Sequence, residues 1–400
     1  MTSQSNIDSS EETERSFVSS ALRNTDGTDR YTTGTDLTEL PADVVLQQSL
    51  TLNSVISTTS SFARRASHPS SHLEFQQPIQ IGEGKQGAIF EKGGFSVATK
   101  KEKPGNETLR SNLQNEFRLH LKVLDAFRRY IDLIDDSVLV PRPFVMVHKS
   151  DMKFPEEGLD EFPEGYRTPS DRFMMERILP LPKIVRRALV TLFYPRETGT
   201  AVDQATINSI LNHTPNKHCL ARTYLGKDDG TFERDNFSLR NFPLFLKSIE
   251  QLGPDPTALA SNMGKAFAIM HWAAGVNGDD VEFVLGTSQE LVLPRPEPPQ
   301  PGFQHRRVGF YLLDFGQCES VDLMREHVDV VYQAFKGAMV TGDNQLFIPH
   351  YRRSPELFAA FKAAYIATGR VILADQRWGD KFSVEEFMEE YQEYAEDFLV

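Results

Sequence analysis

The segment from Ile79 to Lys103, IQIGEGKQGAIFEKGGFSVATKKEK, constrains the fold more than any other part of this chain. Apolar and polar residues alternate along it and glycines interrupt the alternation, a pattern typical of one or two β-hairpins. Gly82, Gly84 and Gly87 fit the spacing G-x-G-x-x-G, but without the following helix that a dinucleotide-binding turn needs. The segment therefore predicts a glycine-rich hairpin loop, which is either a plain turn or a turn that approaches phosphate groups.

Three further residues follow this loop on defined elements. Lys100 ends V-A-T-K on the next strand, Glu116 lies on an amphipathic helix that begins near Asn112, and LLDFGQ places Asp314 after a buried strand. In protein kinases a strand lysine contacts phosphates and pairs with a helix carboxylate, and the aspartate of D-F-G binds metal. Each residue alone also fits an ordinary surface charge or turn. Their order predicts a protein-kinase-like ancestry, with Glu116 as the partner of Lys100.

The segment where a kinase catalytic loop belongs, MHWAAGVNGDDVEFVLG, departs from that pattern. A kinase needs a base Asp soon after its His and an Asn five residues further on for magnesium. His271 is followed by Trp and Ala instead. Aligning DVEFVL with the kinase run P-E-N-I-L-L puts Glu282 at the Asn position and Asn277 at the base. Neither alignment predicts an intact phosphotransfer centre.

Three carboxylates lie within four residues of this segment, at Asp279, Asp280 and Glu282. Such a group can hold Mg²⁺, grip a cationic substrate or act as a general base. Crowded carboxylates raise one another's pKa, as base chemistry near neutral pH requires. The alternative is a purely structural role, in which a carboxylate caps a helix or pairs with an arginine of the C-terminal half, such as Arg306, Arg352 or Arg353.

The net charge of −13 argues against non-specific binding to nucleic acid, although a local basic patch can still hold phosphates. If some of the basic doublets converge, they could follow an RNA backbone; the doublets are Arg128-Arg129, Arg186-Arg187, Arg306-Arg307 and Arg352-Arg353. Only two cysteines are present, and they have no zinc-ligand spacing. No signal peptide and no apolar run of about 18 residues is recognised, so we expect a cytoplasmic chain.

The organisation of the chain follows from its changing composition. Residues 1–75 are rich in Ser and Thr and poor in large hydrophobes, which predicts a disordered tail with at most one docked helix at 43–57. Residues 76–180 predict a β-rich N-lobe, and residues 181–400 a helical C-lobe that carries the acidic loop. Amphipathic helices are expected at 321–339, 355–367 and 384–398, after a Pro-rich loop. The predicted class is α+β, a two-lobed protein-kinase-like fold with a disordered N-terminal tail.

The runs MHWAAGVNGDDVEFVLG, LLDFGQC and FIPHYRRSPELFAAFKAAY resemble a fungal family long catalogued as a domain of unknown function. Within that family the chain looks like the fungal arginine-containing cyclodipeptide synthases of secondary metabolism. The resemblance covers roughly Ile79 to the C-terminus, and DDVEFVLG is its most specific part. It implies an enzyme that joins arginine from arginyl-tRNA to the amino acid of a second aminoacyl-tRNA as a diketopiperazine, without a cofactor. A D-D-x-E-like acidic motif matters in those synthases.

That resemblance places the motif on Asp279, Asp280 and Glu282, which become the candidate catalytic residues. The candidate substrate-binding residues, expected to face the same cleft, are Lys100, Glu116, Asp314, Gly84 and Gly87. No metal ligand, no DNA and no membrane are expected, and nothing in the sequence indicates the second amino acid or the oligomeric state. Two other classes stay open: a phosphotransferase that uses ATP and Mg²⁺ at Glu282 and Asp314, and an inactive pseudokinase-like binding module.

Overall fold

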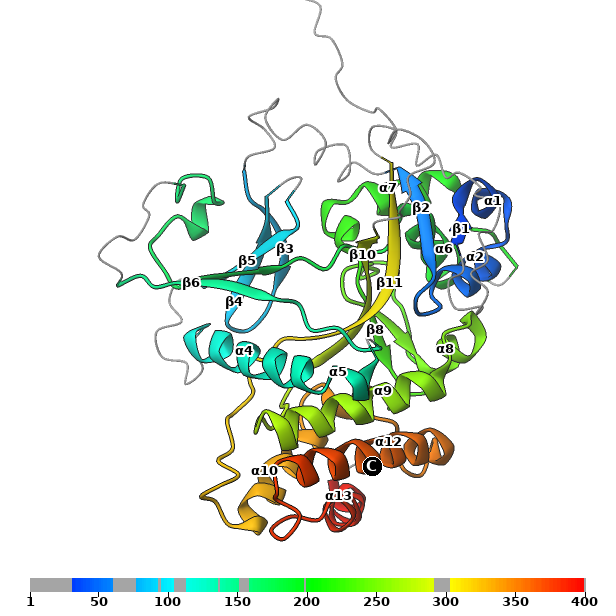
Figure 1. Cartoon of the computed structure of the whole chain (residues 1–400). Helices are drawn as coiled ribbons and strands as arrows, with labels where there is room; N and C mark the ends of the chain where they lie inside the picture. Colours follow the sequence, from blue (N-terminus) through cyan, green and yellow to red (C-terminus); the bar gives the residue numbers. More distant parts are fainter. Residues whose placement is uncertain are drawn as a thin grey trace, which may run out of the picture.

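The computed structural model describes residues 31–59, 77–92, 95–103, 113–135, 137–150, 158–197, 199–290 and 303–398. Within these residues the chain is a mixed α+β protein with two separate β-sheets (Figure 1). The predicted α+β class is therefore confirmed. Predictions for residues 1–30, for residues 60–75 and for the Pro-rich loop at 293–302 lie outside the described residues.

The first sheet has five antiparallel strands in the order β3-β4-β5-β7-β6. Its strands are β3 (Ile79–Glu83), β4 (Gly87–Glu91), β5 (Val97–Glu102), β6 (Pro143–Val147) and β7 (Arg172–Glu176). Helix α4 (Leu113–Arg129) packs against β6 and β7, because its buried Leu119, Val123 and Phe127 recur every four residues along one face. The predicted hairpins and amphipathic helix are thus present, and they bring the glycine-rich turn, Lys100 and Glu116 to one side of the sheet.

The second sheet has six strands in the order β1-β2-β11-β10-β8-β9. Its strands are β1 (Tyr31–Thr33), β2 (Val55–Thr59), β8 (Ala221–Tyr224), β9 (Phe242–Phe245), β10 (Glu282–Glu290) and β11 (Phe303–Leu313). Strands β10 and β11 pair antiparallel with Glu282 opposite Leu313. This register brings Glu282, at the start of β10, next to Asp314, which directly follows β11. The C-terminal half, predicted as helical, therefore also contains most of a sheet.

The docked helix predicted at 43–57 is present in part, as the helix Ala42–Ser49, but most of the rest of residues 31–59 also forms regular structure and differs from the predicted disordered tail. This stretch forms β1, α1 (Gly34–Glu39), α2 (Ala42–Ser49) and β2, and β2 pairs with β11. Val45, Leu46 and Leu50 are buried where α2 packs on α6 (Lys183–Phe193) and α8 (Leu246–Leu252). This short apolar run is too small to form a core of its own, and its side chains are buried against helices that lie far away in the sequence.

Helices cover the lower part of the molecule in Figure 1, with α9 and α12 side by side. The remaining helical elements are α5 (Ile131–Ile134), η2 (Glu164–Tyr166), α7 (Gln204–Asn212), η3 (Thr214–His218), α9 (Pro256–Ala268), η4 (Ile269–Ala273), α10 (Val328–Val340), α11 (Asn344–Phe347), α12 (Pro355–Asp375) and α13 (Val384–Phe398). Helix α13 has the predicted bounds, α12 is longer than predicted, and α10 begins seven residues later than predicted.

Among the described residues, α12 alone has the length and apolar composition of a membrane-spanning helix. No run of this kind was recognised in the sequence. Phe361 and Tyr365 of α12 are fully buried, and the helix packs along α9, so its apolar character has an explanation in the core of the protein. The same two criteria are met by core helices, so the length and composition of α12 do not establish a membrane span.

Replacing Gly264 with alanine is expected to lower the free energy of unfolding by about 1–3 kcal/mol, because overpacking displaces neighbouring backbone. A Cβ atom at Gly264 on α9 would lie 2.3 Å from the carbonyl oxygen of Phe361 on α12. The matched control is Gly337→Ala on α10, where a Cβ atom would meet nothing within 4 Å. The control should be neutral or stabilising by about 0.4–1 kcal/mol. Urea denaturation measures both, and equal effects would contradict the close helix contact.

Candidate functional site

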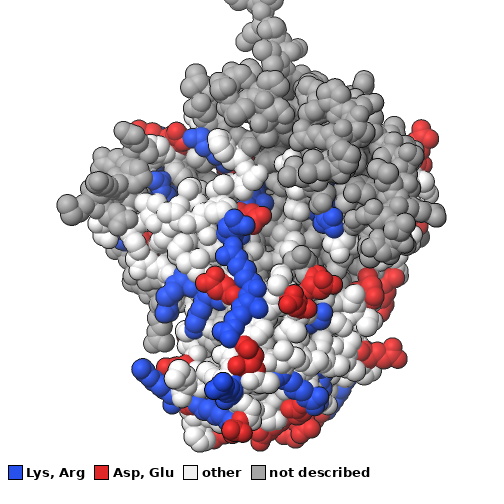
Figure 2. Space-filling model, viewed as in Figure 1, with Lys and Arg blue, Asp and Glu red and all other residues white. Residues whose placement is uncertain are grey.

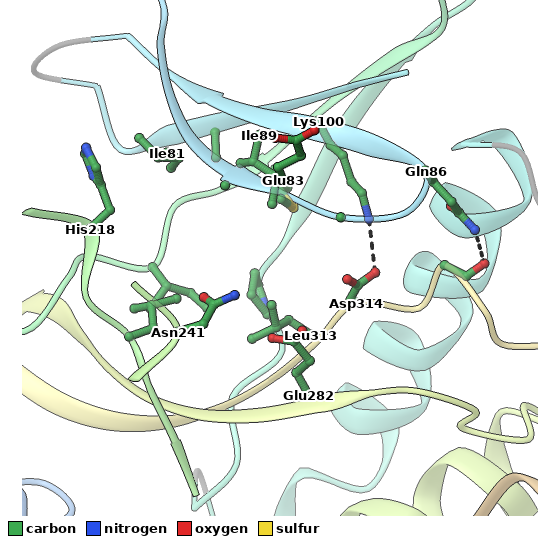
Figure 3. A pocket seen from close by; sticks show the side chains of 18 of the residues that line it. Ile81, Glu83, Gln86, Ile89, Lys100, His218, Asn241, Glu282, Leu313 and Asp314 are labelled. Atoms are coloured by element: carbon green, nitrogen blue, oxygen red, sulfur yellow. Dashed lines mark hydrogen bonds and ion pairs between the residues drawn. The ribbon is translucent and has the colours of Figure 1, made fainter. Parts of the chain in front are cut away.

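A cavity of about 370 Å³ lies between the two sheets, below the glycine-rich turn and above the β10–β11 hairpin (Figure 3). That volume suits a ligand of dipeptide size rather than a macromolecule. Charged side chains of both signs line it. The acidic residues are Glu83, Glu176, Asp280, Glu282, Asp314 and Asp343, and the basic residues are Lys85, Lys100, Arg177 and Arg222.

Lys100 connects three elements at one side of the cavity. Its ammonium group lies 2.6 Å from a carboxylate oxygen of Glu116 on α4 and 3.0 Å from one of Asp314. The predicted pairing of Lys100 with Glu116 is therefore present. Burial opposes the charge of Lys100, but the two carboxylates outweigh it and raise the lysine pKa. Burial raises the pKa of Glu116 to about 7, and the negative charge of Asp314 acts in the same direction, while Lys100 acts to lower it.

Glu282 lies on the opposite side of the cavity, at the start of β10, and contacts the guanidinium of Arg222 on β8. Arg222 also lies 3.0 Å from Asp343, in the turn after α10. Burial raises the pKa of Glu282 to about 7, although Arg222 acts to lower it and Asp314 acts to raise it. A carboxylate that exchanges its proton near neutral pH is suited to general acid–base chemistry.

The two aspartates before Glu282 point to different places. Asp280 lines the cavity and accepts a bond from Lys85 at 3.1 Å and from the backbone N–H of Asp343 at 3.0 Å. Its backbone is left-handed, with φ of 55°, as is that of Asp314 at 63°. Non-glycine residues seldom adopt this conformation except where surrounding contacts fix it, often at binding sites. Asp279 does not line the cavity, and its carboxylate accepts the hydroxyl of Thr341 at 3.0 Å.

His271 and Asn277 have structural roles. His271 is fully buried in the π-helical turn η4, between the hydroxyl of Tyr365 at 2.8 Å and the carbonyl of Asn277 at 3.2 Å. Burial lowers its pKa to about 3, so the ring stays neutral. The side-chain oxygen of Asn277 accepts the backbone N–H groups of Asp279 and Glu319. Neither side chain is placed to act as a base on a ligand in the cavity.

The glycine-rich turn closes the cavity from above, but its glycines differ in role. Gly84 lines the cavity and would place a Cβ atom 3.7 Å from Asp314, whereas its own N–H donates to the carbonyl of Gly87. Gly87 does not line the cavity, and a Cβ atom there would lie 2.5 Å from the carbonyl oxygen of Lys101. Gly87 allows close packing of β4 on β5, which explains this glycine without a ligand, and its role as a substrate-binding residue stays a prediction.

Arg222 and Asp343, which line the cavity and form an ion pair, were not predicted from the sequence, and two of the four predicted basic doublets have one buried member. Arg222 and Asp343 carry no recognisable motif and come together only through the fold. Of the doublets, Arg186 and Arg306 are buried, and the four pairs lie on separate elements. Within the described residues, no group of three or more His, Cys, Asp or Glu side chains is arranged to hold a metal ion.

No protein-family model matches this chain, and no curated protein matches it significantly. Among solved structures, "Structure of the microcompartment-associated aminopropanol kinase" is similar, with 13% sequence identity and a TM-score of 0.24. The match covers 83% of this chain and 93% of that one. A similarity at this TM-score carries no argument about fold or activity, which therefore depend on the contacts described above.

Proposed function

We propose that this chain is an aminoacyl-tRNA-dependent cyclodipeptide synthase, which joins arginine to a second amino acid as a diketopiperazine. The single observation that carries the proposal is Glu282, a carboxylate that lines a cavity of dipeptide size and has a pKa raised by burial to about 7. Such a group can accept the proton of an attacking α-amine at neutral pH. The resemblance of DDVEFVLG to the arginine-containing synthases supports the choice of reaction.

The scaffold on which we place this site is a two-lobed, protein-kinase-like fold. Its support is the contact of Lys100 with both Glu116 and Asp314, below a glycine-rich hairpin turn. These residues correspond in type and order to the lysine, helix carboxylate and D-F-G aspartate of a kinase, which supports this part of the proposal. The kinase base is missing, because Asn277 stands at its position and uses its side chain to bind backbone N–H groups. The scaffold is therefore better suited to a reaction that needs no phosphotransfer.

The proposed chemistry uses a substrate that is already activated. The α-amine of one aminoacyl-tRNA attacks the ester carbonyl of the other, and Glu282 takes the amine proton. The tRNA of the attacked ester then leaves, and its terminal oxygen receives that proton as a hydroxyl. The free amine of the resulting dipeptide then attacks the remaining ester, which closes the ring and releases the second tRNA. Asp280 and Asp343 line the same cavity and supply negative charge for the guanidinium of the arginyl group. ATP has no part in either step.

The test is a reconstituted reaction. We expect the purified protein, incubated with tRNA, aminoacyl-tRNA synthetases, ATP and all amino acids, to form arginine-containing diketopiperazines that mass spectrometry detects. Isotope-labelled arginine should shift the product mass, and RNase treatment of the tRNA beforehand should remove the product. A product that survives RNase, or no product from any amino acid mixture, would contradict the proposal.

A second candidate is a phosphotransferase that uses ATP and Mg²⁺, favoured by the arrangement of Lys100, Glu116 and Asp314. Besides burial, the negative charge of Asp314 raises the pKa of Glu282, so the two carboxylates lie near each other. They stand at paired ends of β10 and β11, where a metal ion could bind together with water. This candidate predicts that ATP with Mg²⁺ raises the melting temperature and that Lys100→Met abolishes the shift. The cyclodipeptide synthase predicts no such shift, so one measurement separates the two.

A further inference from the structure

Helix α4 presents its basic side chains to solvent along one line. Arg118, Lys122 and Arg129 are exposed and are separated by four and seven residues, so they share one face of the helix. We call these three residues the α4 basic stripe. Figure 2 shows Lys and Arg side chains gathered where α4 lies in Figure 1, with acidic side chains between and below them. The stripe stands out on a chain whose net charge is −13.

Neutral groups, rather than carboxylates, hold two members of the stripe. Arg118 donates to the side-chain oxygen of Asn115 at 2.7 Å, and Lys122 donates to the hydroxyl of Ser320 at 2.9 Å. The pKa of Lys122 is lowered by partial burial and then by the charge of Arg118, while Asp322 acts in the opposite direction. Burial is the larger of the two causes, and an added anion would oppose both by favouring the charged form of Lys122.

The acidic residues near the rest of the stripe do not cancel it. Arg129 pairs with Asp375 at 2.8 Å, with both side chains about half exposed, and such surface pairs exchange readily with other anions. Asp125 lies on the same helix face, 3.8 Å from the neighbouring Arg128. Three stripe cations and Arg128 therefore face three carboxylates, those of Asp125, Asp322 and Asp375, and an excess of one positive charge remains for a partner.

The stripe lies close to the cavity. Lys122 bonds to Ser320, which is six residues after Asp314, so the two sites are at most about 20 Å apart along an extended chain. The stripe itself spans about 16 Å at the rise of an α-helix. A ligand that contacts the whole stripe must therefore extend about 16 Å, as a polyanion does and a small anion or a single phosphate does not.

We propose that the α4 basic stripe binds the phosphate backbone of the tRNA whose aminoacyl end enters the cavity. This inference rests on the proposed function for its choice of polyanion. The charges on a helix face supply affinity and orientation rather than sequence readout, as phosphate contacts generally do. The stripe consequently accepts different tRNA molecules, as an enzyme that uses two of them requires.

The test compares two variants that each lose one Arg and one Lys. Arg118→Gln with Lys122→Gln removes two stripe charges, and the matched control, Arg196→Gln with Lys247→Gln, removes two exposed charges elsewhere. Binding of uncharged tRNA is measured by fluorescence anisotropy over a range of salt concentrations. We expect the stripe variant alone to bind at least about ten-fold more weakly, with a log Kd against log salt slope about 1.4–1.8 smaller. Melting temperatures verify that both variants fold.

The outcomes distinguish this inference from the proposed function. If the protein forms diketopiperazine but the stripe variant keeps the wild-type KM for arginyl-tRNA, the stripe is not the tRNA surface, whatever the reaction. If no diketopiperazine forms but the stripe variant alone loses tRNA binding, the surface stands and the reaction does not. Equal weakening in both variants overturns the inference. The inference is also overturned if the stripe variant binds tRNA as the wild type does but no longer binds phosphatidylserine vesicles or a poly-glutamate peptide.

Discussion

Glu282→Gln is expected to lower the rate of cyclodipeptide formation by about 10²–10⁴-fold, the usual contribution of a general base. Glutamine keeps the size of the side chain and can still contact Arg222, but it cannot accept a proton. Binding of arginyl-tRNA should change far less, because the α4 basic stripe is untouched. Single-turnover kinetics with preformed aminoacyl-tRNA measures the chemical step apart from binding and product release.

The pH dependence supplies an independent check on the same residue. Burial raises the pKa of Glu282 to about 7, and only the deprotonated carboxylate can act as the base. The rate at low substrate concentration should therefore rise about ten-fold per pH unit up to about pH 7 and then level off. Glu250→Gln, at an exposed carboxylate of α8, serves as the matched control and should keep the wild-type rate and profile. A Glu282→Gln variant with the full rate would exclude Glu282 as the base.

The parts of the site that the sequence predicted are those with a local signature. Lys100 follows an alternating strand, Glu116 begins an amphipathic helix, and Asp314 ends a buried strand, so each position could be inferred from a few neighbouring residues. Their approach to one another then follows from the order of the elements. The direction of the two aspartates could not be inferred, because Asp279 bonds to Thr341 whereas Asp280 bonds to Lys85 and to the backbone of Asp343, and all these partners are distant in the sequence.

The parts that sequence reasoning missed depend on contacts between distant segments. Arg222 is 60 residues before Glu282 and 121 before Asp343, and no pattern around it indicates either neighbour. The same is true of residues 31–59, whose strand β2 pairs with β11 more than 240 residues away. A polar composition predicts disorder only when no distant surface completes the core, and a single sequence does not reveal such a surface.

The second large effect is expected for Lys100→Met, which should lower the free energy of unfolding by about 3–5 kcal/mol at pH 8. Lys100 is buried and balances two carboxylates, and methionine would leave Glu116 enclosed without a partner. The matched control is Lys85→Met. Lys85 lines the same cavity and pairs with Asp280, but 72% of its side chain is exposed, so its loss should change stability little. Chemical denaturation of both variants measures the difference.

The loss should also depend on pH, in a direction that follows from Glu116. Burial raises its pKa to about 7 even beside Lys100, so without the lysine the carboxyl takes up a proton more readily still. An acid with a raised pKa in the folded state destabilises the protein as pH rises from its ordinary pKa through the raised one. Lys100→Met should thus lower the free energy of unfolding less at pH 5.5 than at pH 8.5.

Adding Glu116→Leu should recover most of the loss at pH 8.5, because the double variant encloses no unpaired charge at that position. A loss that is independent of pH and unrelieved by Glu116→Leu would mean that Lys100 acts through packing alone.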